Sequence, residues 1–162
     1  MTDPAARFAY LAQVVDLTDR DRALVRAARG DLRQRMPVIV DRIVAVILGD
    51  PAMARHFAHD GPPDPSVIGR HLQGWLEGFV ALARDDGLAT WMDRVGRMHQ
   101  AQDGDPRVQV DRLQLNALMA VLADAVLAET SRLDRPVELR FEIARAFSKL
   151  LWIQADLLTR HT

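Results

Sequence analysis

The chain has 162 residues, of which 49% are hydrophobic and 27% are charged. It is therefore long and apolar enough to fold as one domain, residues 1–162. Its 21 basic and 22 acidic side chains give a formal net charge of -1, and no basic stripe stands apart from acidic neighbours, which argues against binding to nucleic acid or an anionic membrane. The sequence contains no cysteine, so histidine and carboxylate side chains remain as possible metal ligands.

The hydrophobic segments are too short to cross a membrane. The longest apolar run, residues 43–48, follows directly after Asp41 and Arg42 and is far shorter than a membrane span. The N-terminal segment carries charges early and lacks the apolar centre of a signal peptide. We therefore expect a cytoplasmic protein with no membrane-spanning segment.

Apolar residues in the first half of the chain recur at helical spacing, and no stretch alternates as a strand would. The prediction is an all-α protein. Asp3 before a proline opens the first helix, and an acidic cap at Thr18 opens the second. Gly30 and Pro37 are expected to interrupt the second helix. A further helix is predicted from Pro37 to Gly49, followed by a short helix over 51–57.

The second half of the chain predicts four more helices, at about 64–84, 91–104, 106–129 and 136–157. Asp64 before a proline repeats the cap of the first helix. The last two helices are longer than the average helix of a small domain. No repeat and no flexible linker divides the chain, which agrees with a single domain.

Five histidines are the candidate ligands, because the sequence contains no phosphate-binding loop, no nucleophile elbow and no zinc-protease motif. His59 lies in a predicted loop and His161 is the penultimate residue, so both are expected to be solvated. His56 ends the short helix and is expected at the surface. His71 and His99 lie on or near apolar helix faces, where a lone histidine is usually a hydrogen-bonded core residue.

His99 has a context that the other histidines lack. Gly96 precedes it by about one turn, and the missing side chain would let a flat group or another helix approach closely. A haem needs an axial imidazole on a rigid element and an apolar wall around it. The residues near His99 offer both.

Five segments occur in a specific order. They are Leu17-Thr18-Asp19-Arg20-Asp21, Leu48-Gly49-Asp50-Pro51, His71-Leu72-Gln73-Gly74-Trp75, Val95-Gly96-Arg97-Met98-His99 and Lys149-Leu150-Leu151-Trp152-Ile153. Together they resemble the globin-coupled sensor family, which is related to protoglobin, over nearly the whole chain. The resemblance implies a globin fold of the sensor type with long last two helices, haem b as cofactor and His99 as the proximal iron ligand.

The same resemblance implies which residues surround the haem. They are Ile43, Phe57, Ile68 and Leu72 on the distal side, and Met98, Leu115 and Met119 as further contacts. Oxygen-sensing members carry a Phe-Tyr pair whose tyrosine donates a hydrogen bond to the bound gas. Here that pair is Arg42-Ile43, and the only tyrosine in the chain is Tyr10. Bound dioxygen would lose this partner, whereas carbon monoxide would lose little.

His71 lies beside the expected ligand face of its helix. It is therefore either a second, distal iron ligand or a residue that contacts a haem propionate or solvent. Trp75, Trp91 and Trp152 lie on apolar helix faces and are interpreted as core or interface residues, and the same interpretation applies to Met98 and Met119 as the alternative to a cofactor contact.

The function implied by the resemblance is a haem-binding sensor domain for a diatomic gas, O2, CO or NO, rather than an enzyme. It would transmit the ligand state through a homodimer interface of the last two helices to an output domain or a partner protein. The last helix has more apolar residues than one face of a monomer should bury: Leu150, Leu151, Trp152, Ile153, Leu157 and Leu158. The chain would be either a stand-alone sensor or part of a longer protein.

Two alternatives remain open. One is a haem-free, globin-like signalling domain, which the missing distal tyrosine allows but the retained His99 motif disfavours. The other is a haem enzyme acting on nitric oxide or peroxide. An apolar distal wall offers no acid–base group for such chemistry unless His71 reaches the ligand.

Overall fold

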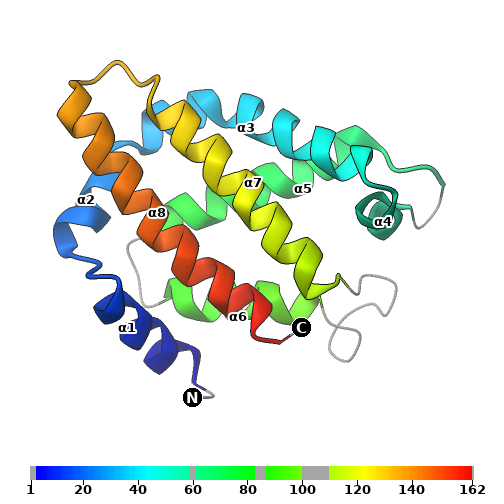
Figure 1. Ribbon diagram of the computed structural model, residues 1–162, viewed down its shortest axis with the longest axis horizontal. Helices are drawn as coiled ribbons and strands as arrows, with labels where there is room; N and C mark the ends of the chain where they lie inside the picture. The colour runs from blue at the N-terminus through cyan, green and yellow to red at the C-terminus, as the bar shows by residue number, and fades with distance from the viewer. Residues whose placement is uncertain (1–2, 59–60, 83–86, 100–109, 162) are drawn as a thin grey trace.

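A computed structural model describes residues 3–58, 61–82, 87–99 and 110–161, and within these ranges all regular structure is helical (Figure 1). The elements in chain order are α1 (Pro4–Val14), α2 (Asp19–Ala27), α3 (Arg29–Gly49), α4 (Pro51–Ala54), the 3-10 turn η1 (Arg55–Phe57), α5 (Pro65–Leu82), α6 (Gly87–Met98), α7 (Arg112–Thr130) and α8 (Val137–Thr159). The prediction of an all-α protein is confirmed.

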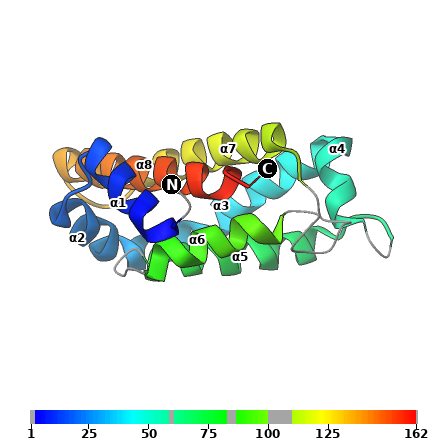
Figure 2. The same ribbon diagram turned by 90° about the horizontal axis from the view of Figure 1, so that it is seen from below.

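The helices pack in two layers with α3 between them. The long helices α7 and α8 lie side by side and antiparallel (Figure 1), and α5 and α6 lie on the opposite side of the molecule (Figure 2). Helix α3 packs against both α5 and α7, while α8 packs against α2, α6 and α7. The largest fully buried side chains between these layers include Phe79, Phe147, Ile68, Met92 and Leu150.

Side-chain caps explain where several helices begin. The Asp3 carboxylate accepts hydrogen bonds from the backbone N–H groups of Ala5 and Ala6, as the sequence predicts. Thr18 and Asp21 form a capping box at the start of α2, and Asp50 caps α4. The predicted helix starts at these positions follow from local chemistry alone.

The predicted interruption at Gly30 and Pro37 is wrong. Helix α3 runs through both residues, and the break lies earlier, at Ala28 between α2 and α3. Proline removes one backbone hydrogen bond from a helix interior. The apolar side chains on both sides of Pro37 are nevertheless buried against neighbouring helices, and this packing outweighs the local cost. They are Leu32, Met36, Ile39, Val40, Ile43, Val44 and Ile47.

Helix α7 begins at Arg112, where Asp111 and Gln114 form a capping box. The predicted start near residue 106 and the predicted end of the preceding helix near residue 104 both lie outside the described residues. Of the described helices, α7 is the one long and apolar enough to cross a membrane by length and composition, which is weak evidence. Its packing against α3 and α8 is that of a core helix.

Helix α8 is buried on more sides than the sequence suggests. Five of the six apolar residues attributed to a dimer interface are buried within a single chain: Leu150, Leu151, Ile153, Leu157 and Leu158. Only Trp152 is exposed. The expectation that one chain could not bury these residues is therefore wrong, because α1, α2, α6 and α7 all pack against α8.

Candidate functional site

Helices α5 and α6 run in opposite directions and are joined at one end by aromatic contacts. The rings of Trp75 and Trp91 are stacked with centroids 6.5 Å apart, and Trp75 also stacks on Phe79 at 6.2 Å. A Cβ added at Gly78 would lie 2.9 Å from the ring of Trp91. The absence of a side chain at Gly78 therefore lets Trp91 lie directly against α5.

The two histidines of interest lie toward the other end of this helix pair. His71 is one turn before Trp75 on α5, and His99 is two turns after Trp91, directly behind α6. Because the helices are antiparallel, these positions approach the same end. When protonated, His71 and His56 both lower the pKa of His99, so the three imidazoles share one neighbourhood.

The ring of His99 has a defined orientation. Its Nδ1 lies 2.8 Å from the backbone carbonyl oxygen of Val95. A carbonyl oxygen only accepts hydrogen bonds, so Nδ1 carries the proton and Nε2 keeps its lone pair. Such a hydrogen bond is what fixes the tautomer and the orientation of metal-ligating histidines.

The protonation of His99 favours the same role. Burial lowers the pKa of His99, the hydrogen bond to the Val95 carbonyl opposes this in part, and the charges of His71 and His56 lower it further. The net pKa lies below the ordinary value of 6.5. The imidazole is therefore neutral near pH 7, which is the form that binds a metal ion.

Close packing supports the helix that carries His99. A Cβ at Gly96 would lie 2.8 and 2.9 Å from the backbone carbonyl oxygens of Leu158 and Leu157 on α8. Only glycine allows the two backbones to approach this closely. The N–H of His99 in turn donates to the Gly96 carbonyl at 3.2 Å, so His99 directly follows a rigid segment.

The predicted cofactor contacts have different environments. Ile43, Ile68, Leu115 and Met119 are buried, and Phe57 and Leu72 are partly buried. By contrast, His71 is exposed, and Met98 is 56% exposed. The apolar residues come from α3, η1, α5 and α7, whereas His71 lies on α5 and Met98 is the last residue of α6. Their roles remain predictions.

Two expectations about the other histidines are wrong. His56 is buried, and its Nε2 lies 2.9 Å from Oε1 of Gln114, near the start of α7. His161 contacts the buried carboxylate of Asp93 rather than solvent. His59 lies outside the described residues. Met53, three residues before His56, is also buried, so both side chains lie on the inner face of the short α4–η1 segment. The helical spacing between an apolar residue and His56 is the sequence signal that could have predicted the burial of His56.

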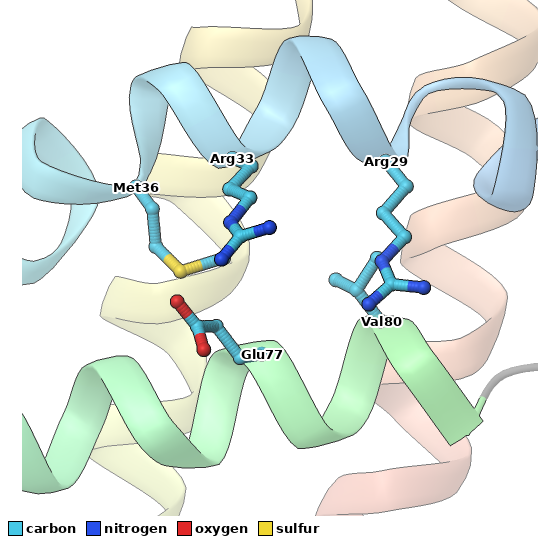
Figure 3. Close-up of a pocket in the computed structure, with 5 residues that line it drawn as sticks. All are labelled: Arg29, Arg33, Met36, Glu77 and Val80. Atoms are coloured by element: carbon cyan, nitrogen blue, oxygen red, sulfur yellow. The ribbon is translucent and has the colours of Figure 1, made fainter.

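A small cavity between α3 and α5 is distinct from this site. It is lined by Arg29, Arg33, Met36, Glu77 and Val80 (Figure 3). Its volume of about 40 Å³ accommodates a few water molecules at most. Glu77 and Val80 flank Gly78, at the aromatic end of α5, so the cavity lies away from His71. It is not a candidate for a cofactor.

The helix arrangement and the position of His99 define the class of protein as a globin. The structure matches the globin domain of the Geobacter sulfurreducens globin-coupled sensor with a TM-score of 0.80 and 18% sequence identity, covering 95% of this chain and 97% of that one. The profile of the Protoglobin family matches residues 4–162, and the chain belongs to this family. No curated protein sequence matches it significantly.

Proposed function

We propose that this chain is a haem-binding globin sensor domain in which His99 is the axial ligand of haem b. The observation that carries the proposal is the orientation of His99, whose Nδ1 donates to Val95 and whose Nε2 is left free. The donor set suits a haem, because His99 offers a neutral imidazole nitrogen, and the residues proposed to line the cofactor include the buried apolar side chains Ile43, Ile68, Leu115 and Met119. When bound, the haem iron supplies a coordination position for a diatomic gas.

The side chains of the distal wall favour a gas that needs no hydrogen-bond donor. Ile43, at the position where a tyrosine would act, is 2% exposed and has no polar group. Ile68 on α5 is also fully buried. This wall supports binding of CO or NO over dioxygen, which relies more on a donor.

Haem reconstitution tests the proposal directly. The wild-type chain should develop a Soret absorption band, and His99→Ala should lose it because the substitution removes the proposed axial ligand. The matched control is His71→Ala, which removes an exposed imidazole from the same neighbourhood and should retain the band. A wild-type chain that takes up no haem would refute the proposal and favour a haem-free signalling domain.

The coordination number of the haem iron in the gas-free protein distinguishes the two roles proposed for His71, a second iron ligand or a contact with a propionate or solvent. The charge of His71 acts on His99, which supports a position near the iron, while its exposure supports contact with a propionate or solvent. Resonance Raman spectra of the gas-free protein distinguish the two. A six-coordinate spectrum that becomes five-coordinate in His71→Ala would identify a second histidine ligand, and one that survives this substitution would exclude it.

The outer face of α7 and α8 suits a homodimer interface. Four large apolar side chains are exposed on these helices: Leu113 (77%), Phe141 (76%), Trp152 (72%) and Val137 (62%). Phe141 and Trp152 lie eleven residues, or three helical turns, apart on α8 and so project from the same side. The two helices lie side by side with this face uncovered (Figure 1). Exposed aromatic residues on adjacent helices are typical of protein interfaces.

Sedimentation velocity tests the interface. Trp152→Glu with Phe141→Glu should shift the protein from dimer to monomer, because both charges would be buried in a symmetric contact. Tyr10→Glu is the control, since Tyr10 is also exposed but lies on α1. A wild-type monomer, or a dimer that tolerates the double substitution, would contradict this interface.

The apolar side chains of Ile43 and Ile68 in the proposed distal wall support a sensing role rather than an enzymatic one, because neither can exchange a proton with a bound ligand. The domain would act in the cytoplasm and pass the ligand state to an output domain or partner protein. Peroxidase turnover by the reconstituted wild-type protein that His71→Ala abolishes would contradict the non-enzymatic role.

A further inference from the structure

The helix that carries His99 is also attached to the end of α8 by a buried charge cluster. Asp93 on α6 is 4% exposed. Its carboxylate accepts from Nε of Arg97 at 3.0 Å, pairs with Nη2 of Arg160 at 2.7 Å and contacts Nε2 of His161. Arg97 belongs to α6 itself, so Arg160 and His161 are the partners that attach this buried carboxylate to the end of α8. Their loss would leave it with fewer of the charged partners that offset its burial.

Close backbone packing acts at the adjacent turn of the same helices. Gly96 is three residues after Asp93, and its Cα faces the carbonyl groups of Leu157 and Leu158. The charge cluster and the glycine contact therefore join the same two segments, residues 93–97 of α6 and residues 157–161. His99 follows two residues after the first segment.

A second buried ion pair on α8 provides an internal comparison. Nζ of Lys149 lies 2.8 Å from the carboxylate of Asp21, and both side chains are largely buried. This pair joins α8 to α2 rather than to α6, and lies about three turns before Arg160 on α8. It is also an ion pair between a buried carboxylate and a cation of α8, but it does not involve the helix that precedes His99.

We infer that Asp93 is a positioning residue for His99, and that through Arg160 and His161 it couples the end of α8 to the ligand state of the haem. This inference rests on the proposed function of His99. Any displacement of His99 on gas binding must move the end of α6 against Asp93 and its partners on α8. The cluster therefore opposes that displacement. The free energy of gas binding is reduced by the cost of moving residues 157–161.

Coupling between two sites is reciprocal. If gas binding shifts the end of α8, then releasing the end of α8 must alter the affinity for the gas. Loss of the Arg160 contact removes the resistance to movement of His99 and should strengthen CO binding. The change should be at least about five-fold, the lower end of typical coupling between sites.

The experiment compares Arg160→Met with Lys149→Met, since each removes the α8 cation of one buried carboxylate. Hydrogen exchange in the haem-free protein is the first measurement. Exchange across residues 87–99 should accelerate in Arg160→Met and stay at the wild-type rate in Lys149→Met after correction for global stability. The second measurement is CO affinity after reconstitution, which should rise in Arg160→Met only.

Further variants keep the test decisive. Arg160→Lys retains a cation and should restore much of the wild-type behaviour, whereas a purely steric role of Arg160 would not be rescued. If Arg160→Met fails to fold, His161→Gln weakens the same cluster more gently and takes its place. Equal responses of the Arg160 and Lys149 variants in both measurements would overturn the inference.

The failure of this inference is distinguishable from failure of the proposed function. A wild-type chain that binds no haem removes the proposed function, and with it the coupling. A wild-type chain that binds haem through His99, together with an Arg160→Met variant of unchanged CO affinity, removes the coupling alone. The hydrogen-exchange comparison shows in either case whether the cluster holds α6.

Discussion

Helix α6 meets α8 and α5 in two different ways. Its contact with α8 involves backbone against backbone at Gly96 and a buried charge cluster around Asp93. Its contact with α5 involves side chains, namely the ring of Trp91 against Gly78 and the ring of Trp75. The backbone contact at Gly96 has no atoms that can change rotamer, whereas the contact with α5 consists of rotatable side chains.

This difference is compatible with the axial-ligand role proposed for His99. On the α8 side of α6, the backbone contact at Gly96 cannot adjust by a change of rotamer. On the α5 side, the side chains in contact can change rotamer. A cofactor inserted between α5 and α6 could displace side chains without disturbing the backbone contact. Substitutions on the α8 side should therefore cost more stability than comparable ones on the α5 side.

The largest effect is expected for Gly96→Ala. Its Cβ would lie under 3 Å from two backbone oxygens of α8, and backbone atoms cannot move aside by changing rotamer. We expect a loss of about 3 kcal/mol in the free energy of unfolding, the upper end for overpacking, measured by urea denaturation. Gly74→Ala is the control, because its Cβ meets open space and should gain up to about 1 kcal/mol from helix propensity.

A smaller loss is expected for Gly78→Ala on the α5 side. The nearest atom to its Cβ is Cζ2 of Trp91 at 2.9 Å, and an indole ring can tilt away. We expect a loss of about 1–2 kcal/mol, within the range of moderate overpacking. The near-ultraviolet circular dichroism of the tryptophans should also change. A loss as large as that of Gly96→Ala would contradict the difference between the two sides.

The next largest effect is expected from acidification, which should reduce the stabilisation that Asp93 gives to the contact between α6 and α8. Burial raises the pKa of Asp93, but the hydrogen bonds of His161 and Arg97 and the charge of Arg160 outweigh it, so the net pKa lies below 3.8. A lowered carboxyl pKa contributes stability that is complete above 3.8 and is lost as the pH falls through the folded value. Urea denaturation between pH 5 and about pH 2 should show this loss, with a shallower slope in Asp93→Asn.

The smallest effect is expected for His71→Ala on the α5 side. Removing this cation should raise the pKa of His99 slightly toward 6.5, as measured by NMR titration of the haem-free protein. Because the folded His99 prefers the neutral form, its contribution to stability is complete above 6.5 and declines as the pH falls below that value. A further decrease of the His99 pKa in His71→Ala would show that the two imidazoles do not interact as described.

Local sequence patterns were sufficient for most of the fold. Asp3, Thr18 and Asp64 each carry an oxygen that can cap the following helix, and these caps act within four residues. The same holds for the hydrogen bond of His99, which reaches Val95 one turn earlier on the chain. Contacts of this range follow from residue order, and the motif around His99 could be identified without coordinates.

The predictions that failed depended on distant partners. Pro37 continues a helix because α5 and α7 bury its neighbours. His56 is buried because Gln114, 58 residues later, accepts its hydrogen bond. The apolar residues of α8 are buried because four helices pack against it rather than one. Each outcome is decided by which elements pack together, and hydrophobic periodicity shows only that a face is buried, not how wide that face becomes.

The sequence by itself determined the helical class, the absence of thiolate ligands, the lack of a tyrosine near Ile43 and the candidacy of His99, since these depend on composition and local spacing. The tertiary structure alone decided that Asp93 meets Arg160 and His161 across 67 and 68 residues of chain. Charges so far apart are brought together only by the close approach of α6 and α8 at Gly96. That approach requires a complete core, which no local pattern encodes.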